Sequence, residues 1–267
     1  MKDIAAVGTT ASGGAAAPRS SRPSLWWTYA SPQHAYPLIG RLVPWFLAAA
    51  VLLTTLGLYI GFFLAPTDHQ QGDAYRIIYV HVPSAWLSML IYVVMAFWAG
   101  LGLILNTRLS SMMAQALAPT GALFAFLALW TGALWGRPTW GTWWVWDARL
   151  TSMLILLFLY IGFMALQSAI DDRRRADKAG AVLALVGVVN VPIIYFSVQW
   201  WNTLHQGSSI SLKTGSSMAA VMLAGMLITT LGLWAYAITV ALVRLRSIVL
   251  DRERHADWVG QLKEVRA

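Results

Sequence analysis

This chain of 267 residues contains no cysteine, and only 11% of its residues are charged. Without cysteine it cannot attach haem through the C-x-x-C-H motif of c-type cytochromes, and it cannot act as a thiol oxidoreductase. It also has no G-x-x-x-x-G-K-[ST] loop for binding nucleotide phosphates. If ATP drives the process in which this chain takes part, a partner chain must hydrolyse the ATP.

Long apolar runs account for the low charge. Hydrophobic residues make up 58% of the chain, which is above the share found in ordinary soluble domains. An apolar run of about 20 residues crosses a bilayer as a helix, and six stretches without Asp, Glu, Lys, Arg or His reach that length. We therefore predict an all-α membrane protein with six transmembrane helices, at residues 42–64, 83–105, 114–134, 150–170, 179–200 and 217–243. Spans without carboxylates or histidines argue against an ion-coupled transporter, because such transporters usually relay protons through these groups.

The basic residues predict the orientation of the chain, because lysine and arginine beside membrane spans are retained on the cytoplasmic side. With six spans both termini share one side, and that side holds 15 of the 19 lysines and arginines. We expect a multi-pass protein of the bacterial inner (cytoplasmic) membrane with both termini in the cytoplasm. Contact of this basic side with anionic lipid accounts for the net charge of +8, and nothing in the sequence indicates nucleic-acid binding.

The chain divides into three parts. Residues 1–40 are expected to form a disordered or interfacial cytoplasmic extension, because the first 24 are rich in Ala, Gly, Ser and Thr and lack the apolar segment of a secretory signal. The aromatic side chains of Trp26, Trp27 and Tyr29 are expected to lie at the inner membrane–water interface. Residues 41–244 form the six-helix membrane domain, and residues 245–267 form a cytoplasmic tail.

Tryptophans are concentrated in one short outer segment. Five of the fifteen lie within twelve consecutive positions, at Trp135, Trp140, Trp143, Trp144 and Trp146. We predict that they belong to a tryptophan-rich periplasmic loop between helices 3 and 4. Broad, rigid indole rings suit a flat aromatic ligand, and haem is the foremost candidate. Because adjacent residues diverge in any regular backbone, some of these tryptophans are expected to be interfacial anchors instead.

Two of the five histidines are candidate metal ligands. His81, just before the second predicted span, and His205, just after the fifth, return to the same outer face as the tryptophans. Neutral imidazole is a good axial ligand for haem iron, and two of them leave no open position for oxygen chemistry. His69, among polar neighbours, is interpreted as a solvated loop residue. We predict that His81 and His205 bind the iron, with Trp200 and Trp201 walling the site near His205.

The outer loops contain four cations, Arg76, Arg137, Arg149 and Lys213. Because haem propionates are anionic, we expect some of these cations to bind them, foremost Arg76 and Arg149. Asp147 has two interpretations that the sequence leaves open. It is either the N-cap of the fourth span or a carboxylate that orients an indole N–H or a loop arginine beneath the haem edge.

Three runs carry a resemblance to a known family. The run W-G-T-W-W-V-W-D-A-R-L-T, from Trp140 to Thr151, resembles the tryptophan-rich signature of the haem-handling membrane proteins of cytochrome c biogenesis. The runs Y-R-I-I-Y-V-H-V-P and V-Q-W-W-N-T-L-H-Q-G-S-S are similar to those of one branch of this family, the haem exporter protein C proteins. The resemblance extends from about residue 41 to residue 244 and does not reach the N-terminal extension.

The resemblance implies a haem-binding and delivery subunit rather than an enzyme. Such a subunit holds haem b (iron protoporphyrin IX) transiently as cargo, through histidines that match His81 and His205, and passes it to a periplasmic haem chaperone for cytochrome c maturation. Its implied partners are an ATP-binding-cassette ATPase subunit, a second permease subunit and a small single-span membrane subunit.

Two other functions remain open. A haem lyase or transferase of the cytochrome c synthase type is disfavoured, because those relatives usually have additional histidines in their spans and a large periplasmic domain. A haem-translocating permease is disfavoured because charge-free spans offer no polar path for the propionates, although a lateral or partner-shared route keeps it open.

Overall fold

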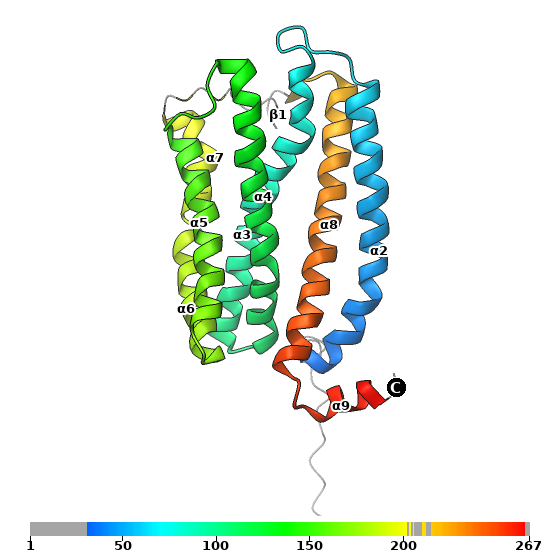
Figure 1. The fold of residues 1–267 in the computed structure, drawn as a ribbon, viewed down its shortest axis with the longest axis vertical. Coiled ribbons are helices and arrows are strands. Elements are labelled where there is room, and N and C mark those ends of the chain that lie inside the picture. Colours follow the sequence, from blue (N-terminus) through cyan, green and yellow to red (C-terminus); the bar gives the residue numbers. More distant parts are fainter. Residues whose placement is uncertain (1–30, 202, 204, 206–209, 212–214, 265–267) are drawn as a thin grey trace, which may run out of the picture.

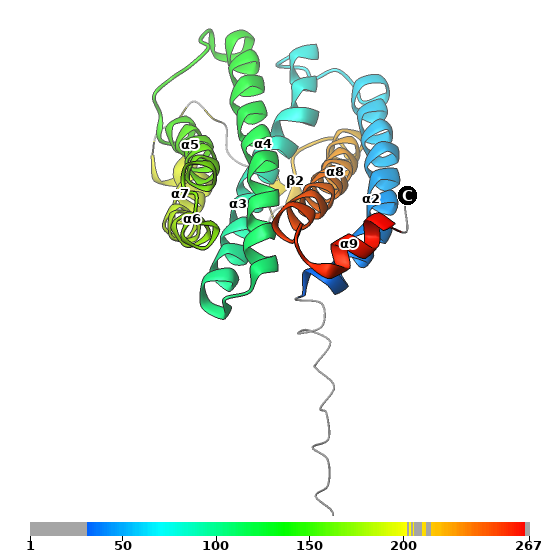
Figure 2. The same cartoon turned by 60° about the horizontal axis from the view of Figure 1, so that its bottom comes forward.

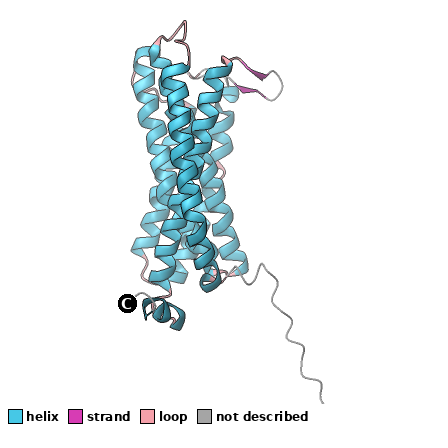
Figure 3. Cartoon of the chain, turned by 90° about the vertical axis from the view of Figure 1, so that its right-hand side faces the viewer, coloured by secondary structure: helices cyan, strands magenta, loops and turns pink. Residues whose placement is uncertain are grey.

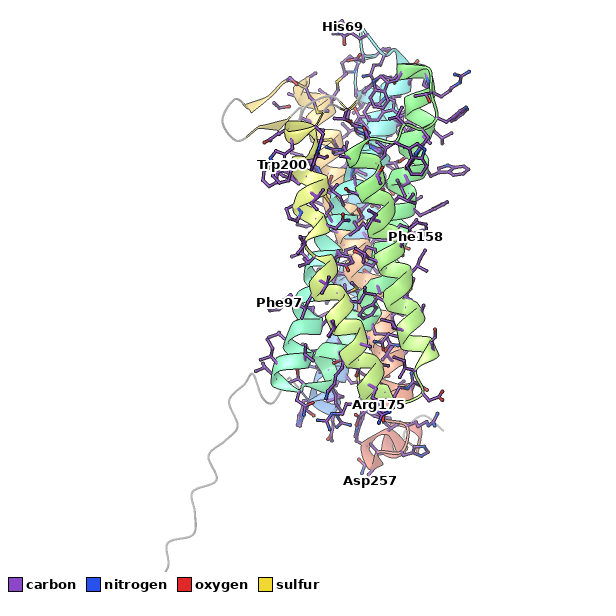
Figure 4. The ribbon with its side chains drawn as sticks, turned by 90° about the vertical axis from the view of Figure 1, so that its left-hand side faces the viewer. His69, Phe97, Phe158, Arg175, Trp200 and Asp257 are labelled. Carbon is purple, nitrogen blue, oxygen red and sulfur yellow. The ribbon has the colours of Figure 1, made fainter. Side chains whose placement is uncertain are left out.

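The computed structural model describes residues 31–201, 203, 205, 210–211 and 215–264. Within this part of the chain, six helical segments are long and apolar enough to cross a membrane, which confirms the predicted number. These segments are Pro32–Leu64, Asp73–Leu105, Arg108–Trp140, Ala148–Ala169, Arg173–Trp200 and Ala220–Arg252. Large apolar side chains such as Phe97 and Phe158 point outward from the middle of the bundle (Figure 4), as expected for a surface in contact with lipid.

Most of the spans consist of one long helix. α2 (Pro32–Tyr59) runs into a π-helical turn, η1 (Ile60–Leu64), and a 3₁₀ turn, η2 (Asp73–Ile77), leads into α3 (Ile78–Leu105). The other elements are α4 (Arg108–Trp140), α5 (Ala148–Ala169), α6 (Arg173–Gly187), α7 (Asn190–Trp200), β1 (Ile210–Ser211), β2 (Gly215–Ser216), α8 (Ala220–Arg252) and α9 (Asp257–Glu264). β1 and β2 form a short antiparallel hairpin that projects from one end of the bundle (Figure 3).

The helices pack in two groups that lie side by side (Figures 1 and 2). One group is the pair α2 and α8, and the other is α3 to α7, with α3 and α4 between the two. Small residues let α2 and α8 approach closely: Gly57 lies against Thr229, and Gly232 lies against Thr54, with no room for a methyl group at either glycine. The larger group buries most of the aromatic core.

The helices extend beyond the apolar runs that predicted them. Residues 32–40, expected in the extension, form the first turns of α2, with Tyr36 and Ile39 buried, and α8 continues to Arg252. Helical hydrogen bonds are local, so a helix that leaves the hydrocarbon continues until a cap or a turn ends it. Residues 1–30, with the expected extension and interfacial aromatics, lie outside the described residues.

The fifth span is broken, although we predicted it as one helix. α6 ends at Gly187 and α7 begins at Asn190. Pro192 has no N–H to donate to the carbonyl of Val188, which instead accepts a bond of 3.0 Å from the N–H of Val191. The side chain of Asn190 donates to the carbonyl of Ser152 on α5, 2.8 Å away. The break therefore has a local cause and a contact that fixes its position.

The prediction of a single tryptophan loop is wrong for Trp135 and Trp140, which lie in the last turns of α4. Gly136 and Pro138, interpreted as turn residues, are helical, and Gly136 is buried against Trp140 and the carbonyl of Thr142. The helix ends only at Gly141, whose φ of 76° is the left-handed conformation that glycine adopts readily after a helix. The connection to α5 is therefore short and contains Trp143, Trp144 and Trp146.

Candidate functional site

A partly open cavity lies at the end of the bundle that carries His69 and Trp200 (Figure 4). It is bounded by the first turns of α3 and α5, the last turns of α4, the connection between α4 and α5, and the segment after α7. Both predicted iron ligands, three predicted tryptophans and one predicted arginine line it: His81, His205, Trp140, Trp143, Trp144 and Arg149. The fold therefore brings together residues from widely separated parts of the sequence.

His81 is held by α4. It lies in the first turns of α3, because that helix begins at Ile78, a few residues before the predicted start of the span at residue 83. Its Nδ1 is 3.0 Å from the hydroxyl oxygen of Thr131, and its ring packs edge-on against Trp135 at a centroid distance of 5.6 Å. The backbone of Gly132 approaches the ring so closely that an added Cβ would lie 3.0 Å from Cε1. Three contacts on one helix therefore fix the orientation of this imidazole.

His205 lies in the segment after α7 and has fewer contacts with the described residues than His81 has. Its ring packs against Trp140 at a centroid distance of 5.2 Å, and its buried Nδ1 has no hydrogen-bond partner among the described residues. Burial, and secondarily the positive charge of Arg149, lowers the pKa of His205 to about 4. The ring is therefore neutral at physiological pH, which is the form that binds iron.

Asp147 combines a capping role with a contact to the segment of His205. One carboxylate oxygen accepts a bond of 2.7 Å from the N–H of Leu150, which makes Asp147 the N-cap of α5, as one of the two interpretations predicted. The other oxygen accepts a hydrogen bond from the hydroxyl of Thr203. The same hydroxyl oxygen is 3.2 Å from the N–H of His205, which donates to it. Asp147 thus holds the His205 segment rather than an indole or an arginine.

Two cations at the outer end, Arg149 and Arg76, have different surroundings. Arg149 lines the cavity. Arg76 lies apart from it: its guanidinium pairs with Asp73 at 2.9 Å and donates to the carbonyls of Gly61 at 2.7 Å and Ala65 at 3.3 Å. These contacts satisfy carbonyls at the end of η1.

The remaining two cations are also not placed in the cavity by the structure. Arg137 donates to the carbonyl of Gly141 and so stabilises the end of α4. Lys213 lies outside the described residues. Among the cations of the described residues, Arg149 is therefore the one in position to meet an anionic ligand of the cavity.

The five tryptophans of this region have different positions relative to the cavity. Trp140, Trp143 and Trp144 line the cavity, and the buried Nε1 of Trp144 has no hydrogen-bond acceptor in the described ranges of the chain. Trp135 supports His81 from behind while its Nε1 donates to Gln71, 2.8 Å away. Trp146 is 77% exposed and packs against Trp144 at 5.3 Å, in the manner expected of an interfacial anchor.

Trp200 and Trp201 do not wall the cavity as predicted. Both rings are exposed, pack edge-on against each other at a centroid distance of 5.8 Å, and are absent from the lining of the cavity among the described residues. The helical turn that ends α7 at Trp200 places these indoles at the surface of the bundle. They have the surroundings of an aromatic belt.

Sequence analysis did not identify two polar residues that contact the histidines of this site, Thr131 and Thr203. Thr131 is hidden within a long apolar run, where threonine is common and rarely functional. Thr203 precedes His205 by two positions, and a hydroxyl that accepts from the N–H two residues later is a known local motif. That spacing is a signal, although a weak one.

The residues of the cavity fit an iron porphyrin. Two imidazoles offer nitrogen ligands, and three indoles offer flat apolar surface. Within the part of the chain that the structure describes, Nδ1 of His205 and Nε1 of Trp144 are buried polar atoms without a partner, and such atoms are costly unless a ligand satisfies them. Arg149 supplies a positive charge for a carboxylate.

Comparisons with known proteins identify the family. The family model described as Heme exporter protein C matches residues 25–260. The Heme exporter protein C of Escherichia coli strain K12 is 48% identical over 241 residues, 89% of this chain and 97% of that protein. The Heme exporter protein C of Bradyrhizobium diazoefficiens is 49% identical over 224 residues, 84% of each chain.

A mitochondrial relative shares a large part of the same region. The "Putative cytochrome c biosynthesis ccmC-like mitochondrial protein" of Marchantia polymorpha is 48% identical over 171 residues, 64% of this chain and 72% of that protein. Because the family model and the bacterial relatives span nearly the whole membrane domain, this chain belongs to the Heme exporter protein C family.

Proposed function

We propose that this protein binds haem b at the periplasmic face of the inner membrane and presents it to a periplasmic haem chaperone for cytochrome c maturation. His81 and His205 are the axial ligands of the iron, and the tryptophans of the cavity form the platform for the porphyrin. The observation that carries this proposal is that both imidazoles line one cavity, although they lie 124 positions apart in the sequence.

The electrostatics of the site support this function. His205 is kept neutral by burial, so its ring is ready to bind iron without first losing a proton. Arg149 binds a propionate, since a guanidinium and a carboxylate form strong charge-assisted bonds. Two axial imidazoles occupy every open position on the iron, so the protein holds haem without performing chemistry on it. We therefore propose a binding and delivery subunit, not an enzyme.

The distribution of charged residues supports the orientation. Arg175 and Asp257 mark the end of the bundle opposite His69 and Trp200 (Figure 4). The first turns of α2 and the helix α9 lie at the same end as Arg175 (Figure 1), and this is the end with most of the basic residues. Basic residues are retained in the cytoplasm, so the cavity faces the periplasm. A periplasmic chaperone approaches it there.

Release of the haem requires partners. Two axial bonds hold haem tightly, so delivery depends on competition by the chaperone or on a conformational change that weakens one bond. We propose that an ATP-binding-cassette ATPase subunit, a second permease subunit and a small single-span subunit assemble with this chain, and that ATP hydrolysis in the ATPase drives this change. A complex with an inactive ATPase that releases loaded chaperone at the normal rate would exclude ATP-driven release.

Absorption spectra of the purified protein test the proposed ligands. Wild type is expected to show the spectrum of six-coordinate low-spin haem, and His81→Ala and His205→Ala are each expected to lose it. His69→Ala is the matched control, because His69 lies in an exposed loop at the same end and does not line the cavity. Retention of the low-spin spectrum in either ligand variant would disprove the proposed ligand pair.

A further inference from the structure

The ring of His81 is oriented by a hydroxyl that the proposed function does not use. Thr131 lies in the interior of α4 and is 8% exposed. Its Oγ1 is 3.0 Å from Nδ1 of His81 and 2.6 Å from the carbonyl oxygen of Leu127, one turn earlier on the same helix. Thr131 therefore connects the imidazole on α3 to the backbone of α4.

The direction of these two hydrogen bonds follows from the chemistry of the groups. A threonine hydroxyl has one hydrogen to donate and two lone pairs that accept. A carbonyl oxygen only accepts, so the short contact with Leu127 uses the hydroxyl hydrogen. The oxygen of Thr131 then accepts from His81, which means that Nδ1 of His81 carries the proton. In a neutral imidazole the other nitrogen, Nε2, then holds the free lone pair.

We infer that Thr131 is a positioning residue that holds His81 in the Nδ1-protonated tautomer and so directs the Nε2 lone pair to the haem iron. This inference rests on the proposed function, since it presumes that His81 is an axial ligand. Histidines that bind metals usually donate their other N–H to a neighbouring acceptor, which fixes the tautomer and makes the ligand a stronger electron donor. Gly132 and Trp135 complete the arrangement by limiting rotation of the ring.

Two substitutions at position 131 separate the hydroxyl from the shape of the side chain. Thr131→Val keeps a β-branched side chain but removes the acceptor, and Thr131→Ser keeps the hydroxyl. Loss of an outer-shell partner typically lowers metal affinity by about 10- to 100-fold. We expect Thr131→Val to bind haem more weakly by this factor and to shift the haem midpoint potential to a more positive value, because a weaker donor stabilises ferric iron less. Thr131→Ser is expected to stay close to wild type.

A matched control comes from α8. Thr239 is 6% exposed and donates to the carbonyl of Ala235 at 2.8 Å, the same bond within a helix that Thr131 makes, but it does not line the cavity. Thr239→Val should therefore leave haem affinity and potential unchanged. If Thr239→Val weakens haem binding as much as Thr131→Val does, the effect is general to the helices and the inference is wrong.

The remaining outcomes distinguish this inference from the proposed function. If His81→Ala keeps the low-spin spectrum, the proposed ligand pair fails, whatever Thr131 does. If His81→Ala loses haem while Thr131→Val matches wild type in affinity and potential, only the positioning role fails. If Thr131→Ser is as weak as Thr131→Val, the hydroxyl is not the cause and the positioning role also fails.

Discussion

His81 and His205 face the same cavity from two kinds of structure. His81 lies on a helix, and a neighbouring helix fixes its ring through Thr131 and Trp135. His205 lies in a connection between helices, its Nδ1 has no partner among the residues that the structure describes, and its segment is held through Thr203. A ligand on a preorganised frame binds with less loss of conformational entropy than a ligand that must first be ordered. For the proposed ligand pair, this difference makes His81 the fixed ligand and His205 the yielding ligand.

The largest expected effect comes from removing each proposed ligand in turn, because each removal eliminates a bond to the iron, and the measurement is residual haem content. Ordering one residue costs about 1–2 kcal/mol, or roughly tenfold in affinity. His205→Ala, which keeps the fixed ligand, is therefore expected to retain about tenfold more five-coordinate haem than His81→Ala. Haem titration of both purified variants checks this. Equal residual affinities, or a reversed order, would remove the distinction between the two ligands.

The next effect concerns the charge near the yielding ligand. Arg149 lines the cavity, whereas the guanidinium of Arg76 is bonded to the end of η1. Hydrogen bonds to charged groups contribute about 1.5–3 kcal/mol, so Arg149→Gln should weaken haem binding by roughly 10- to 100-fold. Arg76→Gln is the comparison, and it should lower thermal stability with little change in haem affinity. A loss of haem in the Arg76 variant at unchanged stability would restore its predicted role as a propionate ligand.

A smaller effect is expected from loosening the segment of His205. Thr203→Ala removes the bond to Asp147 but leaves the cap of α5 intact. A hydrogen bond contributes about 1 kcal/mol, so we expect roughly a fivefold loss of haem affinity. Thr67→Ala is the matched control, because Thr67 also donates to an aspartate, Asp73 at 3.4 Å, in a connection outside the cavity. If Thr203→Ala binds haem as tightly as Thr67→Ala, Thr203 does not position the ligand.

The smallest expected effect is the response of the haem-free protein to pH. The pKa of His205 is lowered to about 4 in the fold, compared with about 6.5 in an unfolded chain. Protonation of His205 therefore opposes folding. The stability that the neutral ring contributes is complete above pH 6.5 and is lost as the pH falls from there through about 4. The NMR signals of the His205 ring should show no protonation between pH 8 and pH 5. A midpoint near pH 6 would mean that the ring is solvated rather than buried.

The sequence was sufficient to predict the six spans and the approach of His81, His205 and the tryptophans to one end. Hydropathy reflects the transfer of side chains into lipid, so it locates spans well, and the parity of the spans then places each connection on one side. It does not locate helix ends, because backbone hydrogen bonds continue beyond the hydrocarbon. For this reason the sequence predicts a loop at Trp135 and Trp140, although both residues belong to α4.

The sequence does not predict which side chains from distant segments contact each other. Thr131 is separated from His81 by 50 positions, and its role depends on how α3 and α4 pack. As a cation on the outer side, Arg76 is predicted to bind a haem propionate, but in the structure its guanidinium donates to carbonyls at the end of η1. In both residues the type of side chain was informative, and only the fold determined its partner.

The break between α6 and α7 has a mechanical consequence for the yielding ligand. A continuous helix resists bending through its chain of backbone hydrogen bonds, and Pro192 interrupts that chain between the two halves of the fifth span. The outer half, α7, leads directly into the segment that contains His205. The span of His81 also has a proline near its start, Pro83, but α3 continues through it as one helix from Ile78 to Leu105. Tilting of α7 about this joint would move the His205 ring away from the iron while the His81 ring stays in place. Only α7 and the segment after it would then have to move for one of the two bonds to break.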